Sequence, residues 1–208
     1  MFTETLSKET KDALILLGKT AFFDKAYLAG GTACALQLGH RISVDLDFFT
    51  PEEFDTSVLA DGLRKAVGFK LEQQRWATLL GTINEAKFSI FYYKYPVLFG
   101  SNPLFNINIL DLRDIAAMKI DAISTRGIKR DFIDLYFLCQ SGISLKDMLL
   151  FYDRKYGTLA SNIIHIQKSL VYFIDADVSI MPRMLKKISW EEVKKYFEAE
   201  VRKMAKKI

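Results

Sequence analysis

Residues 43–49 alternate between two kinds of side chain, and this pattern limits the local fold more than any other feature of the chain. Successive side chains of a β-strand point to opposite faces of a sheet, so the pattern predicts a strand with one buried face. The apolar positions are Val44, Leu46 and Phe48. Asp45 and Asp47 would then project side by side from the polar face.

A short apolar run over 26–29 comes before this strand and ends in Gly30 and Gly31. The order predicts a strand that enters a tight turn, with Thr32 capping a helix over 33–38. Glycine lets a backbone approach a phosphate closely, and the N–H groups of a helix's first turn can donate to it. A Gly-Gly-Thr sequence occurs in many loops, so it is a weak signal by itself.

The two aspartates make the signal sharper. Without a partner, neighbouring carboxylates repel each other, and the pKa of one of them rises. A divalent cation removes that penalty, and Mg²⁺ favours a few carboxylates together with substrate phosphate oxygens. We therefore expect Asp45 and Asp47 to bind Mg²⁺. The alternative is a polar, solvent-facing strand edge, which the apolar face of the same strand makes less attractive.

His40 and Arg41 lie just before the aspartates in the sequence. Their positive charge could meet phosphate, so Arg41 is a candidate nucleotide-binding residue. Alternatively, these residues could pair with Asp45 and have no role in function.

A second group of charged residues lies in the later part of the chain. Between Ile115 and Arg126, a helix would place Lys119 and Arg126 on one otherwise apolar face. Buried cations are costly unless they meet anions, and nucleotide phosphates would serve. The alternative is a lysine whose stem packs while its ammonium reaches water.

Asp131 and Asp134 are three residues apart and would share a helical face. Asp134 stands in an almost continuous apolar run, so its carboxylate needs a partner such as Arg126, Arg130 or Lys119. Such a pair could lock two helices together, or it could position a nucleotide or acceptor. The sequence leaves both interpretations open.

The chain changes character near residue 110. Before it, helices are expected over 7–24 and 59–67, and strands over 26–29, 43–49, 69–71, 77–81, 87–93 and 105–110. After it, helices are expected over 112–124, 130–140, 145–155, 158–173 and 189–206. We therefore expect an α/β lobe over 1–110 and a helical lobe over 111–208, which share a cleft.

Composition limits the class of protein. Half of the residues are hydrophobic and 26% are charged, as in folded globular proteins. No uninterrupted apolar stretch reaches about 18 residues, so no membrane helix is expected. Cys34 and Cys139 stand far apart, which favours a cytoplasmic protein with reduced thiols. The segment 183–207 has nine Lys or Arg against four Glu; it could bind nucleic acid or be a solvated helix face.

Taken together, these motifs resemble the nucleotidyltransferases of the AbiEii/AbiGii toxin family, a branch of the DNA polymerase β-like superfamily. The similarity runs from about residue 28 to residue 140. The matching segments are Gly30-Gly31-Thr32-Ala33 with Leu36-Gln37, His40-Arg41, Ser43 to Phe49, Asp114 to Lys119, and Arg126-Gly127 through Arg130 to Leu135.

The resemblance implies an α+β fold, with a mixed or antiparallel sheet flanked by helices and followed by a helical lobe. It implies that Gly30, Gly31 and Thr32 hold the triphosphate, and that Asp45 and Asp47 bind Mg²⁺. It also implies that Lys119 contacts the nucleotide, and that Asp131 or Asp134 completes the site. Arg126 and Arg130 are further candidates for nucleotide binding. Such proteins resemble toxins of bacterial toxin–antitoxin or phage-defence pairs, with an RNA (tRNA) or protein acceptor and an antitoxin partner.

The sequence departs from the superfamily pattern at one position. Polymerase β-like enzymes usually carry a third carboxylate on a later strand, and Ser89 stands where we would look for it. Glu85 and Asp111 are the candidate substitutes. Two hypotheses follow: a nucleotidyltransferase, or a module of the same fold that binds nucleotide with weak or no catalysis. A third is an interaction protein whose helical lobe and basic tail bind RNA or an antitoxin.

Overall fold

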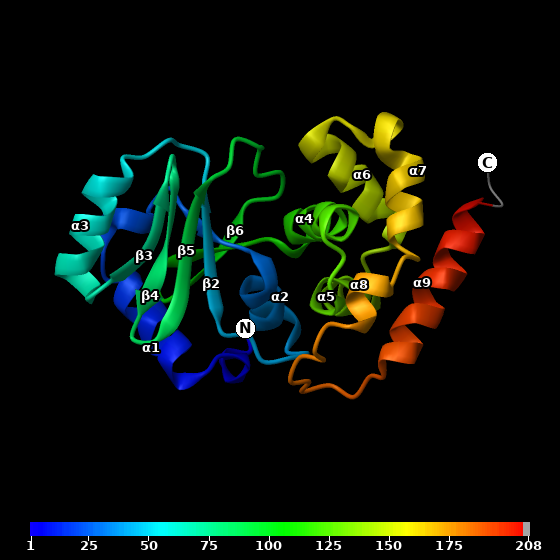
Figure 1. Ribbon diagram of the computed structural model, residues 1–208, viewed down its shortest axis with the longest axis horizontal. Helices are drawn as coiled ribbons and strands as arrows, with labels where there is room; N and C mark the ends of the chain where they lie inside the picture. Colours follow the sequence, from blue (N-terminus) through cyan, green and yellow to red (C-terminus); the bar gives the residue numbers. More distant parts are fainter. Residues whose placement is uncertain (206–208) are drawn as a thin grey trace. The chain divides into compact units, whose positions relative to one another are not determined.

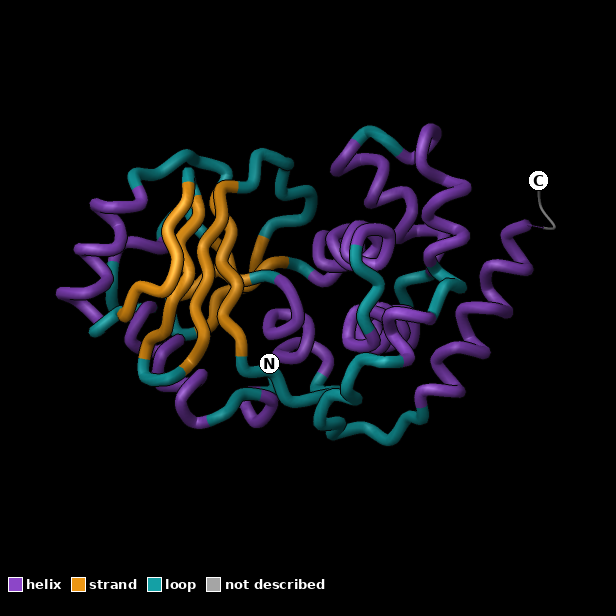
Figure 2. Tube along the Cα trace, viewed as in Figure 1, coloured by secondary structure: helices purple, strands orange, loops and turns teal. Residues whose placement is uncertain are grey.

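The computed structural model describes residues 1–205 and divides the chain into two compact units, Met1–Asp111 and Leu112–Ile208 (Figure 1). The first unit combines a sheet with helices, and the second is helical (Figure 2). This is the α+β fold that the sequence predicts.

The described residues of the first unit form a seven-stranded mixed sheet with the order β3-β4-β5-β2-β1-β7-β6. The strands are β1 (Tyr27–Leu28), β2 (Asp45–Thr50), β3 (Lys70–Arg75), β4 (Thr78–Ile83), β5 (Ala86–Tyr92), β6 (Ser101–Leu104) and β7 (Ile107–Leu110). The central strand β2 pairs antiparallel with β1 and parallel with β5. The predicted strand that carries the two aspartates therefore lies in the middle of the sheet.

Helices pack on this sheet because their apolar faces need cover. They are α1 (Lys8–Leu17), α2 (Gly30–Leu38) and α3 (Thr56–Val67), with single 3₁₀ turns at Thr3–Thr5 and Ala21–Phe23. Leu14 and Leu17 of α1 are fully buried. In the same unit, the ring of Phe48 packs 4.6 Å from that of Phe23 and 5.7 Å from that of Phe88, centroid to centroid. The apolar residues of β2 thus face a core, as their alternation predicts.

The second unit contains α4 (Leu112–Thr125), α5 (Lys129–Gln140), α6 (Leu145–Tyr156), α7 (Leu159–Ser169), α8 (Ile174–Asp177) and α9 (Trp190–Ala205). Aromatic rings form its core around Phe132, which contacts Phe173, Trp190 and Phe197 at centroid distances of 5.3–5.8 Å. None of the helices in residues 1–205 combines the length and apolar character needed to cross a membrane.

Several features of the first unit differ from the prediction, among them a helix end, the burial of one side chain and a missed strand. The helix expected over 7–24 ends at Leu17. Gly18 follows it and packs so closely that a Cβ there would lie 1.7 Å from the carbonyl oxygen of Phe105. Val44 precedes β2 and is 50% exposed, so the expectation that it shares the buried face is wrong. Strand β6 is absent from the prediction, because Pro103 lies within it and a proline argues against a strand.

Two boundaries in the second unit also differ. The helix expected over 158–173 stops at Ser169, and the short helix α8 follows. The break lets Phe173 turn into the aromatic core beside Phe132. The last expected helix, 189–206, is observed as α9, and residue 206 lies outside the described residues, as does Lys207 of the basic tail.

Candidate nucleotide and metal site

The turn between β1 and α2 presents backbone amides at the start of a helix. Ala29 is the N-cap residue, and its own N–H donates to the main-chain oxygen of Asp47 at 3.0 Å. The first N–H of the helix that donates to a carbonyl oxygen one turn earlier is that of Ala33, which donates to Ala29 O at 3.4 Å. The amides of Gly30, Gly31 and Thr32 come before it, where a helix offers no carbonyl partner. These three N–H groups form a candidate anion site.

Asp47 lies directly against this turn. Gly30 has a φ of +65°, and a Cβ built on it would lie 3.2 Å from Oδ2 of Asp47. Asp45 precedes Asp47 by two residues on β2, so both side chains project from the same face, and both are half-buried. Two carboxylates on one face, one of them beside a glycine turn, match the oxygen donors that Mg²⁺ prefers. The arrangement fits the predicted metal and triphosphate chemistry within one unit.

Thr32 differs from its predicted role as a cap. The helix begins at Gly30, three residues earlier than expected, and Thr32 lies inside its first turn. Its hydroxyl donates to the main-chain oxygen of Asp45 and lies 2.8 Å from the Ser43 hydroxyl. The side chain is 1% exposed, so it ties α2 to the start of β2. Only its backbone amide is placed for an anion.

We predict that Gly30→Ala will reduce both stability and nucleotide binding. An alanine at φ +65° costs about 1–2 kcal/mol of folding free energy, and its methyl would also crowd the Asp47 carboxylate. Gly68→Ala is the matched control, because Gly68 has φ +68° and a Cβ there would meet nothing within 4 Å. Urea unfolding should show similar losses for both variants, whereas calorimetry with Mg²⁺ and nucleotide should show weaker binding only for Gly30→Ala. Equal affinity for the two would contradict the assignment.

Ser89 lies beside Asp47 on the neighbouring strand. The parallel pairing of β2 with β5 sets Asp47 opposite Ser89 and Asp45 opposite Lys87. Glu85 is in the turn before β5, with a φ of +67°, and therefore has no place opposite Asp47. Sequence reasoning missed Lys87, because only the strand register shows that its position adjoins Asp45.

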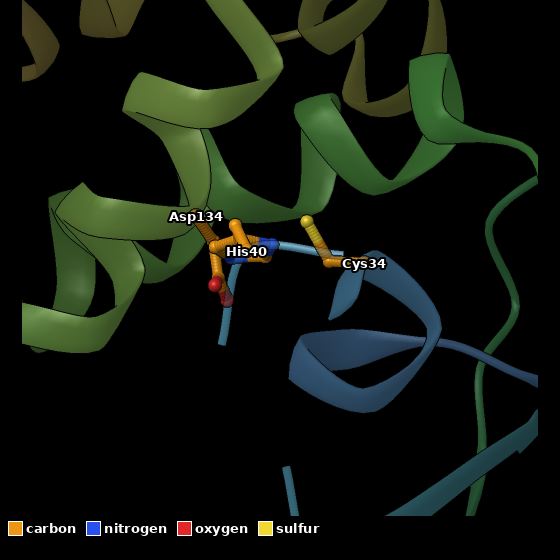
Figure 3. A group of neighbouring side chains, drawn as sticks. All are labelled: Cys34, His40 and Asp134. Carbon is orange, nitrogen blue, oxygen red and sulfur yellow. The ribbon is translucent and has the colours of Figure 1, made fainter. Parts of the chain in front are cut away.

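Arg41 and His40 are buried in the first unit, at 3% and 0% exposure. Arg41 donates from Nη1 to the carbonyl oxygen of Ile42 at 3.1 Å. His40 follows α2, the helix that carries Cys34 (Figure 3). A nucleotide contact by Arg41 stays a prediction.

The second unit brings four of the predicted residues together. Lys119 Nζ on α4 lies 2.8 Å from Asp131 Oδ1 and 2.6 Å from Asp134 Oδ2, both on α5. Figure 3 shows the Asp134 side chain projecting from that helix. Arg126 donates to Asp131 through Nε at 2.9 Å and Nη2 at 3.1 Å. Both carboxylates are fully buried, so the network joins α4 to α5 as the ion-pair alternative predicts. Arg130, by contrast, is exposed.

The network changes the titration of Asp131. Burial by itself raises the pKa of this carboxyl, but the charge of Lys119 and the hydrogen bonds from Arg126 outweigh it, so the pKa is lowered from 3.8. A carboxyl with a lowered folded-state pKa stabilises the fold above its unfolded pKa, and the contribution disappears as the pH falls through the folded value.

We therefore predict that the contribution of Asp131 to stability is fully present above about pH 5 and is lost progressively below about pH 4. The free energy of unfolding should fall across that range, as measured by urea titration at a series of pH values. Asp131→Asn has no carboxyl to titrate at this position, so its free energy of unfolding should fall less over the same pH range. A decline of the same size in both proteins would show that Asp131 is not its source.

A second buried ion pair was not anticipated from the sequence. Lys155 Nζ on α6 lies 2.7 Å from Asp114 Oδ1 on α4, and both side chains are fully buried. The lysine stands near the end of a helix whose pattern suggests an exposed face, so nothing local indicates its partner 41 residues away. The pair fastens α6 to α4, which gives it a structural role.

Comparison with known proteins agrees with this geometry. The family model described as nucleotidyl transferase AbiEii toxin, type IV TA system, matches residues 14–104 and 92–207. An uncharacterized protein of Aquifex aeolicus (strain VF5) is 39% identical over 204 residues, which cover 95% of this chain and 96% of that protein.

Solved structures share the fold at low sequence identity. A putative nucleotidyltransferase from H. pylori aligns with a TM-score of 0.58 and 18% identity, covering 97% of this chain and 96% of its own. MenT4, a nucleotidyltransferase toxin from Mycobacterium tuberculosis H37Rv, aligns with a TM-score of 0.58 and 17% identity, covering 92% and 81%. With the family model spanning nearly the whole chain, the protein belongs to the AbiEii toxin family of nucleotidyltransferases.

Proposed function

We propose that this nucleotidyltransferase moves a nucleoside monophosphate from a nucleoside triphosphate to an acceptor hydroxyl in a reaction that depends on Mg²⁺. The observation that carries the proposal is the Asp47 carboxylate beside Gly30, at the first turn of α2. Amides that would bind an anion and carboxylates that would bind a metal lie there within a single unit. A metal–triphosphate complex needs both kinds of group at once.

The proposed step breaks one bond to the α-phosphorus and forms another. The acceptor oxygen bonds to the α-phosphorus, the bond from that atom to the oxygen bridging to the β-phosphate breaks, and pyrophosphate leaves. The proton of the acceptor hydroxyl passes to water. Asp45 and Asp47 would hold Mg²⁺, which would neutralise negative charge on the phosphates. The amides of Gly30 and Gly31 would hold the leaving phosphates, so this chain contributes chiefly positioning and charge.

The family description and the toxin named among the fold relatives support a role as the toxin of a toxin–antitoxin or phage-defence pair. Its partners would be a nucleoside triphosphate, an RNA or protein acceptor, and an antitoxin. Induced expression should then arrest bacterial growth, and a variant with both Asp45→Asn and Asp47→Asn should not. Arrest by the double variant would separate any toxicity from nucleotidyl transfer.

The proposed reaction is tested by following two differently labelled nucleotides. The full chain is incubated with Mg²⁺ and cell lysate, and each nucleotide carries its label either at the α- or at the γ-phosphate. Label from the α-position should appear in a macromolecule, label from the γ-position should not, and EDTA should abolish transfer. Transfer from the γ-position would replace the proposed reaction by phosphorylation.

A second candidate is a module that binds nucleotide with weak or no catalysis. Ser89 favours it, because the strand position opposite Asp47 carries a hydroxyl where the superfamily pattern has a carboxylate. Calorimetry separates the candidates. Binding of Mg²⁺ and nucleotide, together with an absence of label transfer to RNA and protein fractions, would favour the binding module.

A further inference from the structure

Two hydrogen bonds join the glycine turn to the strand that carries the aspartates. Strand β1 pairs with the part of β2 that follows Asp47, so both aspartates lie beyond the end of that pairing. The N–H of Ala29, just before the turn, donates to the main-chain oxygen of Asp47 at 3.0 Å. The hydroxyl of Thr32, in the first turn of α2, donates to the main-chain oxygen of Asp45. The Thr32 side chain therefore satisfies a carbonyl group that a longer β1 would have satisfied.

Ser43 extends this contact towards the start of β2. Its Oγ lies 2.8 Å from Oγ1 of Thr32, and its N–H donates to the main-chain oxygen of Thr5 at 2.9 Å. The Thr32 side chain is 1% exposed and that of Ser43 is 7% exposed, so water has little access to either hydroxyl. We call Thr32 and Ser43 the hydroxyl pair. The pair holds the first turn of α2 and the residues before β2 in one buried arrangement.

The hydroxyl pair links two kinds of group that a metal–triphosphate complex would need together. The amides of Gly30 and Gly31 lie within two residues of Thr32, and the Asp45 carboxylate belongs to the residue whose carbonyl Thr32 holds. Mg²⁺ requires nearly ideal octahedral geometry at about 2.0–2.1 Å, so a carboxylate and a phosphate can share one ion only at a set spacing. Removal of the Thr32 hydroxyl would therefore alter ligand binding as well as stability.

We propose that Thr32 and Ser43 are positioning residues, which set the spacing between the glycine turn and the aspartate carboxylates and thereby couple the binding of Mg²⁺ to the binding of phosphates. The inference rests on the proposed nucleotidyl transfer, because that reaction supplies the need for both ligands. The Thr32 hydroxyl acts through the strand, since its proton is held by the Asp45 carbonyl. The amide of Thr32 remains in the candidate anion site.

The coupling is measured by calorimetry with inorganic triphosphate, which carries phosphates without a base. Its affinity for the full chain is determined with and without Mg²⁺, and the ratio of the two affinities is compared between variants. Complex formation between Mg²⁺ and triphosphate in solution is the same for each variant, so it does not affect the comparison. Mg²⁺ should raise the affinity of the unmodified protein about tenfold or more, and that of Thr32→Val about threefold or less.

Thr10→Val is the matched control. Thr10 lies on α1, is also 1% exposed, and donates from its hydroxyl to the main-chain oxygen of Val44 at 3.1 Å. It too has a serine partner, since its Oγ1 lies 2.9 Å from Oγ of Ser7. Both valine variants should therefore lower the urea midpoint by similar amounts, but Thr10→Val should keep the coupling of the unmodified protein. An equal loss of coupling in both would overturn the proposal in favour of general destabilisation.

Two further variants grade the effect. Thr32→Ser keeps the hydroxyl and should retain the coupling within about twofold of the unmodified protein. Ser43→Ala leaves the bond from Thr32 to Asp45 in place, so its coupling should lie between those of Thr32→Val and the unmodified protein. Should Thr32→Val not fold, Ser43→Ala compared with Thr10→Val carries the test. Full coupling in Ser43→Ala would overturn the role of Ser43.

Hydrogen exchange gives a measurement that needs no ligand. Thr32→Val removes one of the two bonds that hold the turn on β2, so the segment 29–35 should exchange about fivefold faster or more, as followed by mass spectrometry. The same segment should exchange at the unmodified rate in Thr10→Val. Unchanged exchange in Thr32→Val would show that its hydroxyl does not hold the turn, and would overturn the proposal.

Label transfer distinguishes the failure of this inference from the failure of the proposed function. Thr32→Val should lower kcat for α-label transfer about tenfold to a hundredfold, with a smaller change in KM, because a misplacement of about 1 Å is enough for such a loss. If the coupling depends on Thr32 but no α-label is transferred, the inference stands and the proposed reaction fails. If Thr32→Val transfers α-label with an unchanged kcat, the reaction stands and the inference is overturned. Absence of coupling in the unmodified protein would overturn the inference whatever reaction the protein catalyses.

Discussion

Asp47→Asn is expected to lower nucleotidyl transfer by about a hundredfold to a thousandfold. Asparagine keeps the size and the strand position of Asp47 but removes the charge that would hold Mg²⁺ beside the glycine turn. A bound metal contributes several kcal/mol to stabilisation of phosphoryl transition states, and each 1.36 kcal/mol corresponds to a factor of about ten in rate. The measurement is the initial rate of α-label transfer at saturating nucleotide.

A matched control is Asp12→Asn, which removes one exposed carboxylate from α1. It should transfer label at the rate of the unmodified protein. Asp47→Asn should also lose the rise in melting temperature that Mg²⁺ and nucleotide together produce, because a ligand stabilises only a fold that binds it. Transfer by Asp47→Asn at the unmodified rate would remove Asp47 from the metal site.

Lys119→Met is expected to destabilise the fold by about 3–5 kcal/mol, the cost of breaking a buried ion pair from one side. The ammonium lies within 2.8 Å of carboxylate oxygens of both Asp131 and Asp134, and all three side chains are at most 4% exposed. Methionine keeps the apolar stem and leaves the two acids without this cation. The measurement is the free energy of unfolding in urea, at neutral pH.

Two comparisons show whether the loss comes from the buried charges. Lys25→Met breaks the ion pair between Lys25 and Glu52, whose side chains are 71% and 57% exposed. This substitution should lower the free energy of unfolding by at most about 1 kcal/mol. Adding Asp134→Asn to Lys119→Met should recover part of the stability, because Asp131 still has Arg126 at 2.9 Å. If Lys119→Met alone were as stable as the unmodified protein, Lys119 would not be needed to stabilise the two buried carboxylates.

Local patterns predicted the strand of the two aspartates and the glycine turn. Alternation places Asp45 and Asp47 on one face in any strand, and a pair of glycines after an apolar run marks a turn before a helix. Helix α5 was predicted almost to its ends for a similar reason, since its apolar run is long. These features depend on neighbours a few residues apart, which a single sequence displays.

The start of α2 shows where local reasoning failed. A threonine near a helix start favours the cap position, yet Thr32 lies in the first turn, with its hydroxyl on the main-chain oxygen of Asp45. That partner is 13 residues away. The buried pair of Lys155 with Asp114 was missed for the same reason, because a lysine near a helix end usually reaches water.

The sequence by itself determined the residue types at the candidate positions of each unit. These are two same-face carboxylates and a glycine turn in the first unit, and a lysine spaced to share a helical face with an arginine in the second. Tertiary structure decided which residues stand beside them. The parallel register of β2 with β5 sets Ser89 opposite Asp47 and Lys87 opposite Asp45, and the packing of α4 on α5 gives Lys119 two carboxylates. The physical reason is that spacing along a chain fixes the direction of a side chain, whereas strand register and helix packing arise from contacts between distant segments.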